Sequence, residues 1–189
     1  MREHEYETEI DTRLEGKLGF DRVRTFVADR CSTEYAVTRV TEERFSNDPK
    51  VIRERLALTD EMRLIVMFEE NFPTNGYIDC LDFLKPLEKT GYTIDILSLG
   101  KLRTMVETVR KLTNFFMSIK DGVYPNLKRM SAPVLSFPEV QRRIDQILDK
   151  FGDVKDTASD KLLEIRRAIK TKEGAISKRA NAILKQAQA

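Results

Sequence analysis

The sequence predicts an all-α fold: a helical bundle core followed by a long, lever-like C-terminal helix. Apolar residues recur at spacings of three and four in nearly every segment, and no segment shows sustained alternation. The chain has 189 residues, of which 41% are hydrophobic and 34% charged, with only 8 glycines and 6 prolines. This composition suits a helical protein with one sizeable core. We expect residues 1–151 to form that core and residues 152–189 a polar turn and a basic helix.

Three short helices are expected before residue 48. The first ends at Gly19, Asp21 caps the second, and Ser32 caps the third, because short polar side chains accept hydrogen bonds from free amides of a first turn. The residues expected to face inward are Ile10, Leu14, Leu18, Val23, Phe26, Val27, Ala36, Val37 and Val40. Short helices with short breaks predict a tightly folded bundle.

A long helix is expected to begin at Asp48-Pro49, because Asp is a good N-cap and Pro fits the first helical position. It should run to about Glu70 and end in the loop 71–76. The next segment, 78–89, has a helical pattern, but Pro86 removes one backbone hydrogen bond and crowds the preceding turn. We therefore expect a kink or a restart there.

The most regular apolar stripe predicts a helix that Ser98 caps and that runs to about Ser118. Its inward residues are Leu99, Leu102, Val106, Val109, Leu112, Phe116 and Ile119. The pair Phe115-Phe116 is interpreted as core, although stacking on nucleic-acid bases is an alternative.

The segment after this helix is broken by Gly122, Pro125 and Pro133, and Pro138 opens a further helix that Phe151-Gly152 closes. Any extended backbone should be short and lie at 92–96 or at Val154.

The last quarter of the chain, from Gly152, is a polar turn and then one basic helix that starts near Ser159. Its apolar stripe is Leu162, Ile165, Ile169, Ile176, Ala180, Ile183 and Ala187. From Lys161 onward there are eight basic residues against two acidic ones, so any polyanion should be met here. The candidate contacts to nucleic-acid phosphates are Arg166, Arg167, Lys170, Lys172, Lys178 and Arg179. The alternative is that these charges are the solvated face of a bundle helix.

No glycine cap or proline follows the stripe, and the chain stops at Gln188-Ala189. We expect that the sequence is part of a longer protein and that the helix continues there.

The sequence contains no recognisable catalytic or cofactor site, so we expect this segment to have no enzymatic activity. Gly100-Lys101 lacks the earlier glycine of a phosphate-binding loop, and His4 is the only histidine. Cys31 and Cys80 lack metal-ligand spacing. No metal or cofactor is expected to bind residues 1–189. There is no apolar run of membrane-spanning length, so we expect a soluble, cytoplasmic protein without membrane contact.

Three motifs carry a resemblance to a known family. They are Leu18-Gly-Phe-Asp21, Asn75-Gly-Tyr-Ile-Asp79 with Gly91, and the turn Gly152-Asp-Val-Lys-Asp-Thr-Ala-Ser159 with Leu162 and Ile165-Arg166-Arg167. Together they resemble the N-terminal part of the second type of bacterial MutS paralogue, the endonuclease MutS family with a C-terminal Smr domain. The resemblance covers nearly the whole chain, and its most specific part is the last motif. The sequence departs from the expected pattern at Phe72-Pro73 and at Pro86.

The resemblance implies a helical core and the first lever helix of a larger protein. The family's levers lead to a clamp and return to a dimeric ATPase domain, and an Smr-type nuclease domain follows. It also implies ATP and magnesium sites outside residues 1–189, a homodimer, and action on branched or mismatched DNA, in recombination suppression and repair, or on collided ribosomes and their RNA. None of the family's catalytic residues has a counterpart here.

Two functions remain open from the sequence. The first is the core and lever module of such an ATPase, with DNA or the ribosome bound through the basic helix. The second is a stand-alone helical adaptor that pairs with a partner helix through its C-terminal stripe. An open reading frame that continues into a phosphate-binding loop would favour the first.

Overall fold

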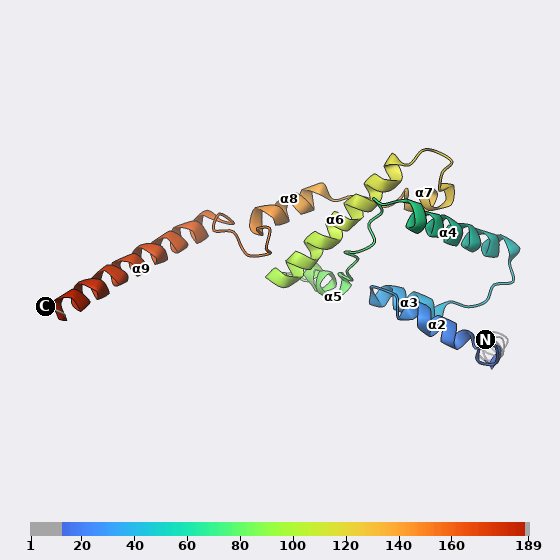
Figure 1. The fold of residues 1–189 in the computed structure, drawn as a ribbon, viewed down its shortest axis with the longest axis horizontal. Helices are drawn as coiled ribbons and strands as arrows, with labels where there is room; N and C mark the ends of the chain where they lie inside the picture. Colours follow the sequence, from blue (N-terminus) through green and yellow to red (C-terminus); the bar gives the residue numbers. More distant parts are fainter. Residues whose placement is uncertain (1–12, 188–189) are drawn as a thin grey trace.

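The structure is a computed structural model, and it describes residues 13–187. Its 69% helix content confirms the predicted all-α fold. Residues 13–187 contain no strand, only one isolated antiparallel bridge between Leu148 and Val154. Figure 1 shows the helices gathered at one end and a single long helix, α9, extending from the other. His4 and Ile10 lie outside the described residues.

The described chain begins with helical residues 13–18, and the hairpin of α2 (Phe20–Ala28) and α3 (Glu34–Glu42) follows. Gly19 has a φ of 70°, which glycine adopts without strain, and it lets α2 begin directly. Asp21 therefore lies in the first turn of α2 and not at its cap. Thr33, and not Ser32, caps α3, because its hydroxyl accepts the amide of Ala36 at 3.1 Å.

One buried ion pair holds this hairpin to the helix before it. Both nitrogens of the Arg24 guanidinium fork donate to the Glu15 carboxylate, at 2.7 and 2.8 Å. Arg24 also donates to the carbonyl of Glu43 and lies 5.1 Å from the Phe20 ring centroid. The Glu15 side chain is 4% exposed, so this ion pair is shielded from solvent.

The core lies between α4 (Pro49–Phe68), α6 (Ile96–Ser118) and α7 (Pro125–Ser131). Its buried side chains are Ile65, Phe115, Phe116, Tyr124 and Leu127. Asp48 caps α4 as predicted, with its carboxylate 2.8 Å from the amide of Lys50. Both phenylalanines of α6 are buried, so the interpretation as core is confirmed and base stacking on them is excluded.

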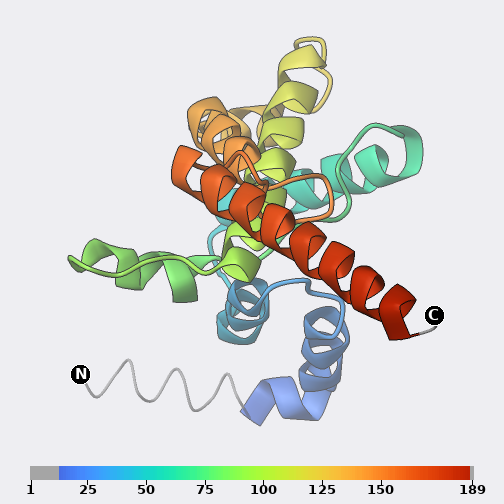
Figure 2. The same ribbon diagram turned by 90° about the vertical axis from the view of Figure 1, so that its left-hand side faces the viewer.

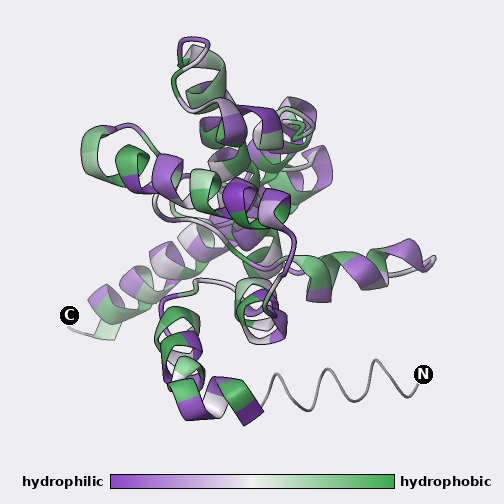
Figure 3. Ribbon diagram, turned by 90° about the vertical axis from the view of Figure 1, so that its right-hand side faces the viewer, coloured by the Kyte–Doolittle hydropathy of each residue, from purple (hydrophilic) through white to green (hydrophobic). Residues whose placement is uncertain are grey.

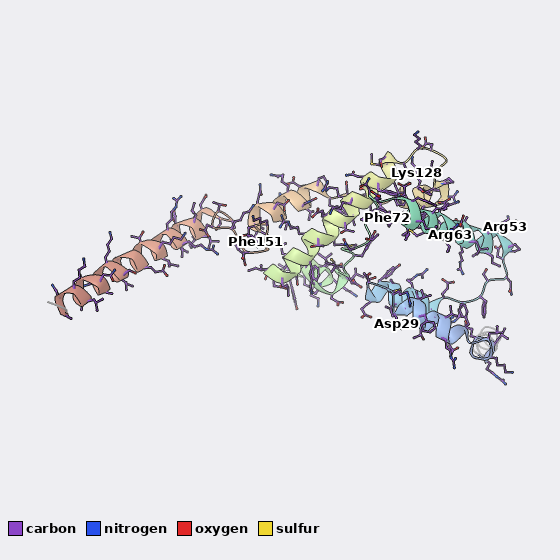
Figure 4. The ribbon with its side chains drawn as sticks, in the orientation of Figure 1. Asp29, Arg53, Arg63, Phe72, Lys128 and Phe151 are labelled. Atoms are coloured by element: carbon purple, nitrogen blue, oxygen red, sulfur yellow. The ribbon has the colours of Figure 1, made fainter. Side chains whose placement is uncertain are left out.

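Phe72, labelled in Figure 4, lies where the chain leaves α4, and its ring packs edge to face against Phe115 with centroids 5.2 Å apart. This loop residue completes the core cluster.

Two local predictions for the segment before α6 need correction. Asp95, and not Ser98, caps α6, since its carboxylate accepts both the amide and the hydroxyl of Ser98. The helix expected over 78–89 is shorter: α5 (Leu81–Leu84) passes directly into the 3₁₀-helix η1 (Lys85–Glu88). The change at Lys85-Pro86 matches the predicted restart, because proline fits the start of a new helical turn.

The helix α7 was not predicted, because Gly122 and Pro125 were interpreted only as breaks. Tyr124 takes the left-handed conformation (φ 98°), so Pro125 starts a new helix. Glu61, a 9% exposed residue of α4, accepts the amides of Asn126 and Leu127 at 3.1 and 2.8 Å. A carboxylate from a distant helix thus satisfies the free amides of the α7 N-terminus.

The last core helix, α8 (Pro138–Ile147), packs on α6 and ends earlier than predicted. Leu148, 1% exposed, terminates it, and Phe151-Gly152 form the turn that follows. The predicted extended segment is confirmed at Val154, which pairs with Leu148, whereas 92–96 forms no strand.

Candidate nucleic-acid interface

The candidate interface is α9 (Asp160–Ala187), a helix of 28 residues and therefore roughly 42 Å long. It begins where the sequence predicted, since the Ser159 hydroxyl accepts the amide of Leu162 at 3.2 Å. The predicted division between residues 1–151 and 152–189 stays a prediction. Figure 2, which views the molecule from the side of α9, shows the helix crossing in front of the core.

The turn before α9 is fixed to the core. Arg103 of α6 forms an ion pair with Asp145 of α8 at 2.7 Å and donates to the carbonyl of Asp149 at 2.7 Å. The Asp149 carboxylate accepts the amides of Phe151 and Asp153, and these hydrogen bonds, with the nearby Lys155, hold its pKa below its usual value despite the opposing effect of desolvation. The turn is therefore an ordered connection between α8 and α9.

The base of α9 is held to this turn by Arg166. Its guanidinium forms an ion pair with Asp156 and donates to the carbonyl of Val154 at 3.3 Å. Lys170, one turn further on, lies 4.0 Å from the same carboxylate. Two of the six predicted phosphate contacts thus share an acidic partner within the chain.

Beyond its first turns, α9 is exposed on every side. It is not part of any of the main helix–helix contacts within residues 13–187, and from Arg167 to Ala187 every residue is exposed. Ile176 and Ile183 are 68% and 61% exposed. Figure 3 shows apolar and polar residues alternating along the helix. The structure therefore does not place α9 within a bundle in this chain.

Successive side chains of an α-helix point about 100° apart around the helix axis, so the positions along α9 fall on distinct faces. The apolar face, which we call the isoleucine stripe, consists of Ile165, Ile169, Ile176, Ala180 and Ile183. About half a turn away lies the basic ridge, which we define as Arg167, Lys178 and Lys185. Lys172 and Arg179 flank the stripe.

The structure therefore places the six predicted residues in different environments. Arg167 and Lys178 share one face and have no ion-pair partner among residues 13–187, whereas Arg166 and Lys170 lie beside Asp156. Lys185 extends the ridge but was not among the six. Its 7-residue spacing from Lys178 is the sequence signal that indicates a shared face.

The described residues show no other chemical centre. Within 13–187, no group of three or more His, Cys, Asp and Glu residues is placed to hold a metal ion. None of the helices in this range is both long and apolar enough to cross a membrane. Burial raises the pKa of the Cys80 thiol, which disfavours its reactive thiolate form.

Comparison with known proteins gives a distant relationship. No family model matches the chain. Over 182 residues, or 95% of the chain, it is 25% identical to proteins named Endonuclease MutS2 from Listeria innocua and from a Geobacillus strain. A protein of the same name from Clostridium perfringens is 26% identical over 177 residues. The chain spans 22–23% of the length of these relatives.

The resemblance drawn from the motifs is confirmed: the chain is a distant relative of the MutS2 proteins. The relationship extends over the core and α9 alike, because the matches cover 93–95% of the chain.

Proposed function

We propose that this chain is the non-catalytic core and lever module of a MutS-like ATPase and endonuclease, and that α9 contacts the phosphates of nucleic acid. The single observation that carries the proposal is the projecting, unpacked α9 with a basic ridge along one face. In the whole protein we propose ATP with magnesium as cofactors, a homodimer in the cytoplasm, and a role in DNA repair, recombination suppression or ribosome rescue.

The way in which the base of α9 is held supports the proposed role of the helix as a lever. A helix transmits motion only if its root is fixed, and Arg103, Asp149 and Arg166 join that root to α6 and α8 through hydrogen bonds and ion pairs. The helix is unbroken over 28 residues, and its backbone bonds are internal. A rotation of the core would therefore move the far end of α9 as one body.

The ridge supports phosphate binding. Lysine and arginine attract phosphates regardless of base sequence. Arg167 and Lys178 lie about three helical turns apart, and Lys178 and Lys185 about two turns apart. The ridge can therefore contact a sugar-phosphate backbone at several points along its length. DNA and ribosomal RNA both present that chemistry, and both are included in the proposal.

A second candidate function is that of a helical adaptor. The exposed isoleucine stripe favours it, because Ile169, Ile176 and Ile183 are spaced by seven residues, as in a coiled-coil seam. In that case the partner covers the stripe and the ridge stays in solvent.

The proposal is tested by direct binding to labelled duplex DNA, branched DNA and ribosomal RNA at low salt, with fluorescence anisotropy. The ridge variant carries Arg167→Gln, Lys178→Gln and Lys185→Gln, which removes three charges and keeps helix propensity. We expect its affinity to fall by at least about tenfold with unchanged circular dichroism.

The matched control removes three positive charges from the surface of residues 13–151, with Arg22→Gln, Lys50→Gln and Arg53→Gln. These three residues are exposed and have no ion-pair partner within 13–187; Arg53 is labelled on α4 in Figure 4. The control should bind as the wild type does. Equal affinity of the wild-type chain and the ridge variant would rule out the ridge as the binding face.

A further inference from the structure

A hollow of about 600 Å³ lies where the start of α6 meets the turn between α8 and α9. Its apolar wall includes Leu97 and Phe151, which are 71% and 79% exposed. Three basic residues, Lys101, Arg103 and Lys150, also line it, and none of the described residues that line it is acidic. The hollow therefore combines exposed apolar surface with positive charge, which suits an anion that carries a flat apolar group.

Phe151, labelled in Figure 4, is held in an ordered turn although its ring is exposed. The Asp149 carboxylate accepts the amide of Phe151 at 2.8 Å, which fixes the backbone of the turn. The ammonium group of Lys150 lies 4.8 Å from the centroid of the Phe151 ring, so a cation–π contact keeps the charge beside the ring. With 79% of its surface exposed, the ring adds little to the packing of residues 13–187 and is accessible to a ligand.

Two of the three cations are available to a phosphate. Lys101 and Lys150 are exposed and form no ion pair within 13–187. Arg103 is already engaged, because it pairs with Asp145 and donates to the carbonyl of Asp149. A partner that covered only the apolar wall would leave Lys101 and Lys150 without an anion, so the charge of the hollow favours a phosphate-bearing ligand over an apolar protein surface.

Gly100 leaves room in the hollow. It lies inside α6, where glycine is a poor helix former. Apart from its chain neighbours and the backbone of its own helix, no atom lies within 4 Å of the position that a Cβ would occupy there. The packing of α6 therefore does not require a glycine at this position, and the missing side chain widens the space in front of the basic residues.

We propose that this hollow binds an unpaired nucleotide, with the base stacked on Phe151 and the phosphates against Lys101 and Lys150. A combination of aromatic rings and basic residues is the usual means by which proteins bind single-stranded nucleic acid. A base inside a duplex is already stacked on its neighbours, so an exposed ring stacks on an unpaired one. The proposal rests on the proposed function, since the ligand is a nucleic acid and the turn leads directly to α9. It adds a preference for single-stranded segments over plain duplex.

Tryptophan fluorescence tests the stacking directly. The chain contains no tryptophan, so Phe151→Trp places a single indole in the hollow. The ligands are oligothymidylate and oligouridylate of about 16 nucleotides and a blunt DNA duplex of the same length, at low salt. We expect both single strands to quench the indole, because a stacked base quenches its emission, and the duplex to leave it unchanged. The stronger of the two single strands identifies DNA or RNA as the preferred source of the nucleotide.

The matched control for the fluorescence is Phe68→Trp, at a 68% exposed position of α4 outside the hollow. Its emission should respond to none of the three ligands.

Fluorescence anisotropy of the labelled ligands gives a second readout. Phe151→Leu removes the ring, and Gly100→Leu fills the hollow. Each should lower the affinity for single strands by at least about fivefold and leave the affinity for duplex unchanged. Phe151→Tyr keeps a ring and should bind as the wild type does, as should the control Phe68→Leu. Because leucine favours a helix more than glycine does, unfolding of α6 does not explain a loss in Gly100→Leu, and circular dichroism verifies this.

The outcomes separate this proposal from the function of the ridge. The ridge variant should bind duplex and single strands more weakly alike, whereas the hollow variants affect single strands alone. Quenching of Phe151→Trp that persists when the ridge charges are removed without loss of affinity would refute the ridge and support the hollow. An unquenched Phe151→Trp under saturating oligonucleotide would overturn the proposal for the hollow and leave the ridge intact. Wild-type affinity of Phe151→Leu for single strands would overturn it as well.

Discussion

At the scale of single residues, two buried carboxylates, Glu61 and Glu15, join separate helical segments. Glu61 of α4 accepts two backbone amides and the Asn126 side-chain amide, the last at 2.7 Å, and so fixes where α7 begins. Glu15 does the same for the N-terminal hairpin through Arg24. The Glu61 contacts are not visible as a sequence motif, because the partners lie 65 and 66 residues away. The partner of Glu15 is nine residues away, across the break at Gly19, so no helical spacing indicates that pair.

We predict that Glu61→Gln destabilises the chain by about 1–3 kcal/mol, because a buried acceptor of three donors loses its charge and one of its acceptor oxygens. Urea unfolding followed by circular dichroism measures the change. Glu54→Gln is the control, since Glu54 is exposed and contacts Arg129 only at 3.5 Å. Equal stability of the two variants would contradict the role of Glu61.

The Glu15–Arg24 pair predicts a dependence of stability on pH. The hydrogen bonds from Arg24 lower the pKa of Glu15 in the folded chain. The contribution of the pair is therefore present above the ordinary pKa of a glutamate and is lost as the pH falls through the lowered value. We expect the difference in unfolding free energy between wild type and Glu15→Gln to shrink on acidification below that ordinary pKa. A difference that stays constant as the pH falls would disprove the linkage.

At the scale of elements, the sequence predicted the long helices well, but it missed the short α7 and made the helix at 78–89 too long. The stripes of α4 and α6 extend over several turns, and Asp48-Pro49 is a strong local start signal. The seven-residue α7 has no stripe of that length, and a distant carboxylate supplies its cap. The N-caps at Thr33 and Asp95 were missed because a neighbouring residue offered the same chemistry.

The isolation of α9 predicts fast hydrogen exchange. Few buried contacts oppose local opening of its distal half, whereas α6 carries core residues such as Phe115 and Phe116. In exchange followed by mass spectrometry, peptides from 172–187 should exchange much faster than peptides from 105–116. Similar protection of both segments at a concentration where the chain is monomeric would contradict the exposed arrangement of α9.

At the scale of the whole molecule, the sequence predicted a basic helix beyond a helical core. It did not predict which basic residues of that helix are paired with an acid of the same chain. That depends on the turn before α9, where Asp156 is placed beside Arg166 and Lys170. The spacing of residues along α9 does determine the ridge, because helix geometry alone brings Arg167, Lys178 and Lys185 to one face.

The sequence has neither a phosphate-binding loop nor a plausible acid-base set, so we predict that residues 1–189 alone do not hydrolyse ATP or cleave DNA. Phosphate release and plasmid nicking in the presence of magnesium measure both activities. Turnover that copurifies with the chain through successive chromatographic steps would show that a catalytic site has been overlooked.

Contact between the basic ridge of α9 and phosphates is tested most directly by the salt dependence of DNA binding. Each lysine or arginine on a phosphate releases condensed counterions, so the slope of log affinity against log salt falls by roughly one unit for each contact removed. We expect a slope about three units smaller for the ridge variant and an unchanged slope for the Arg22, Lys50 and Arg53 control. Identical slopes for the wild-type chain and the ridge variant would show that the ridge does not contact phosphates.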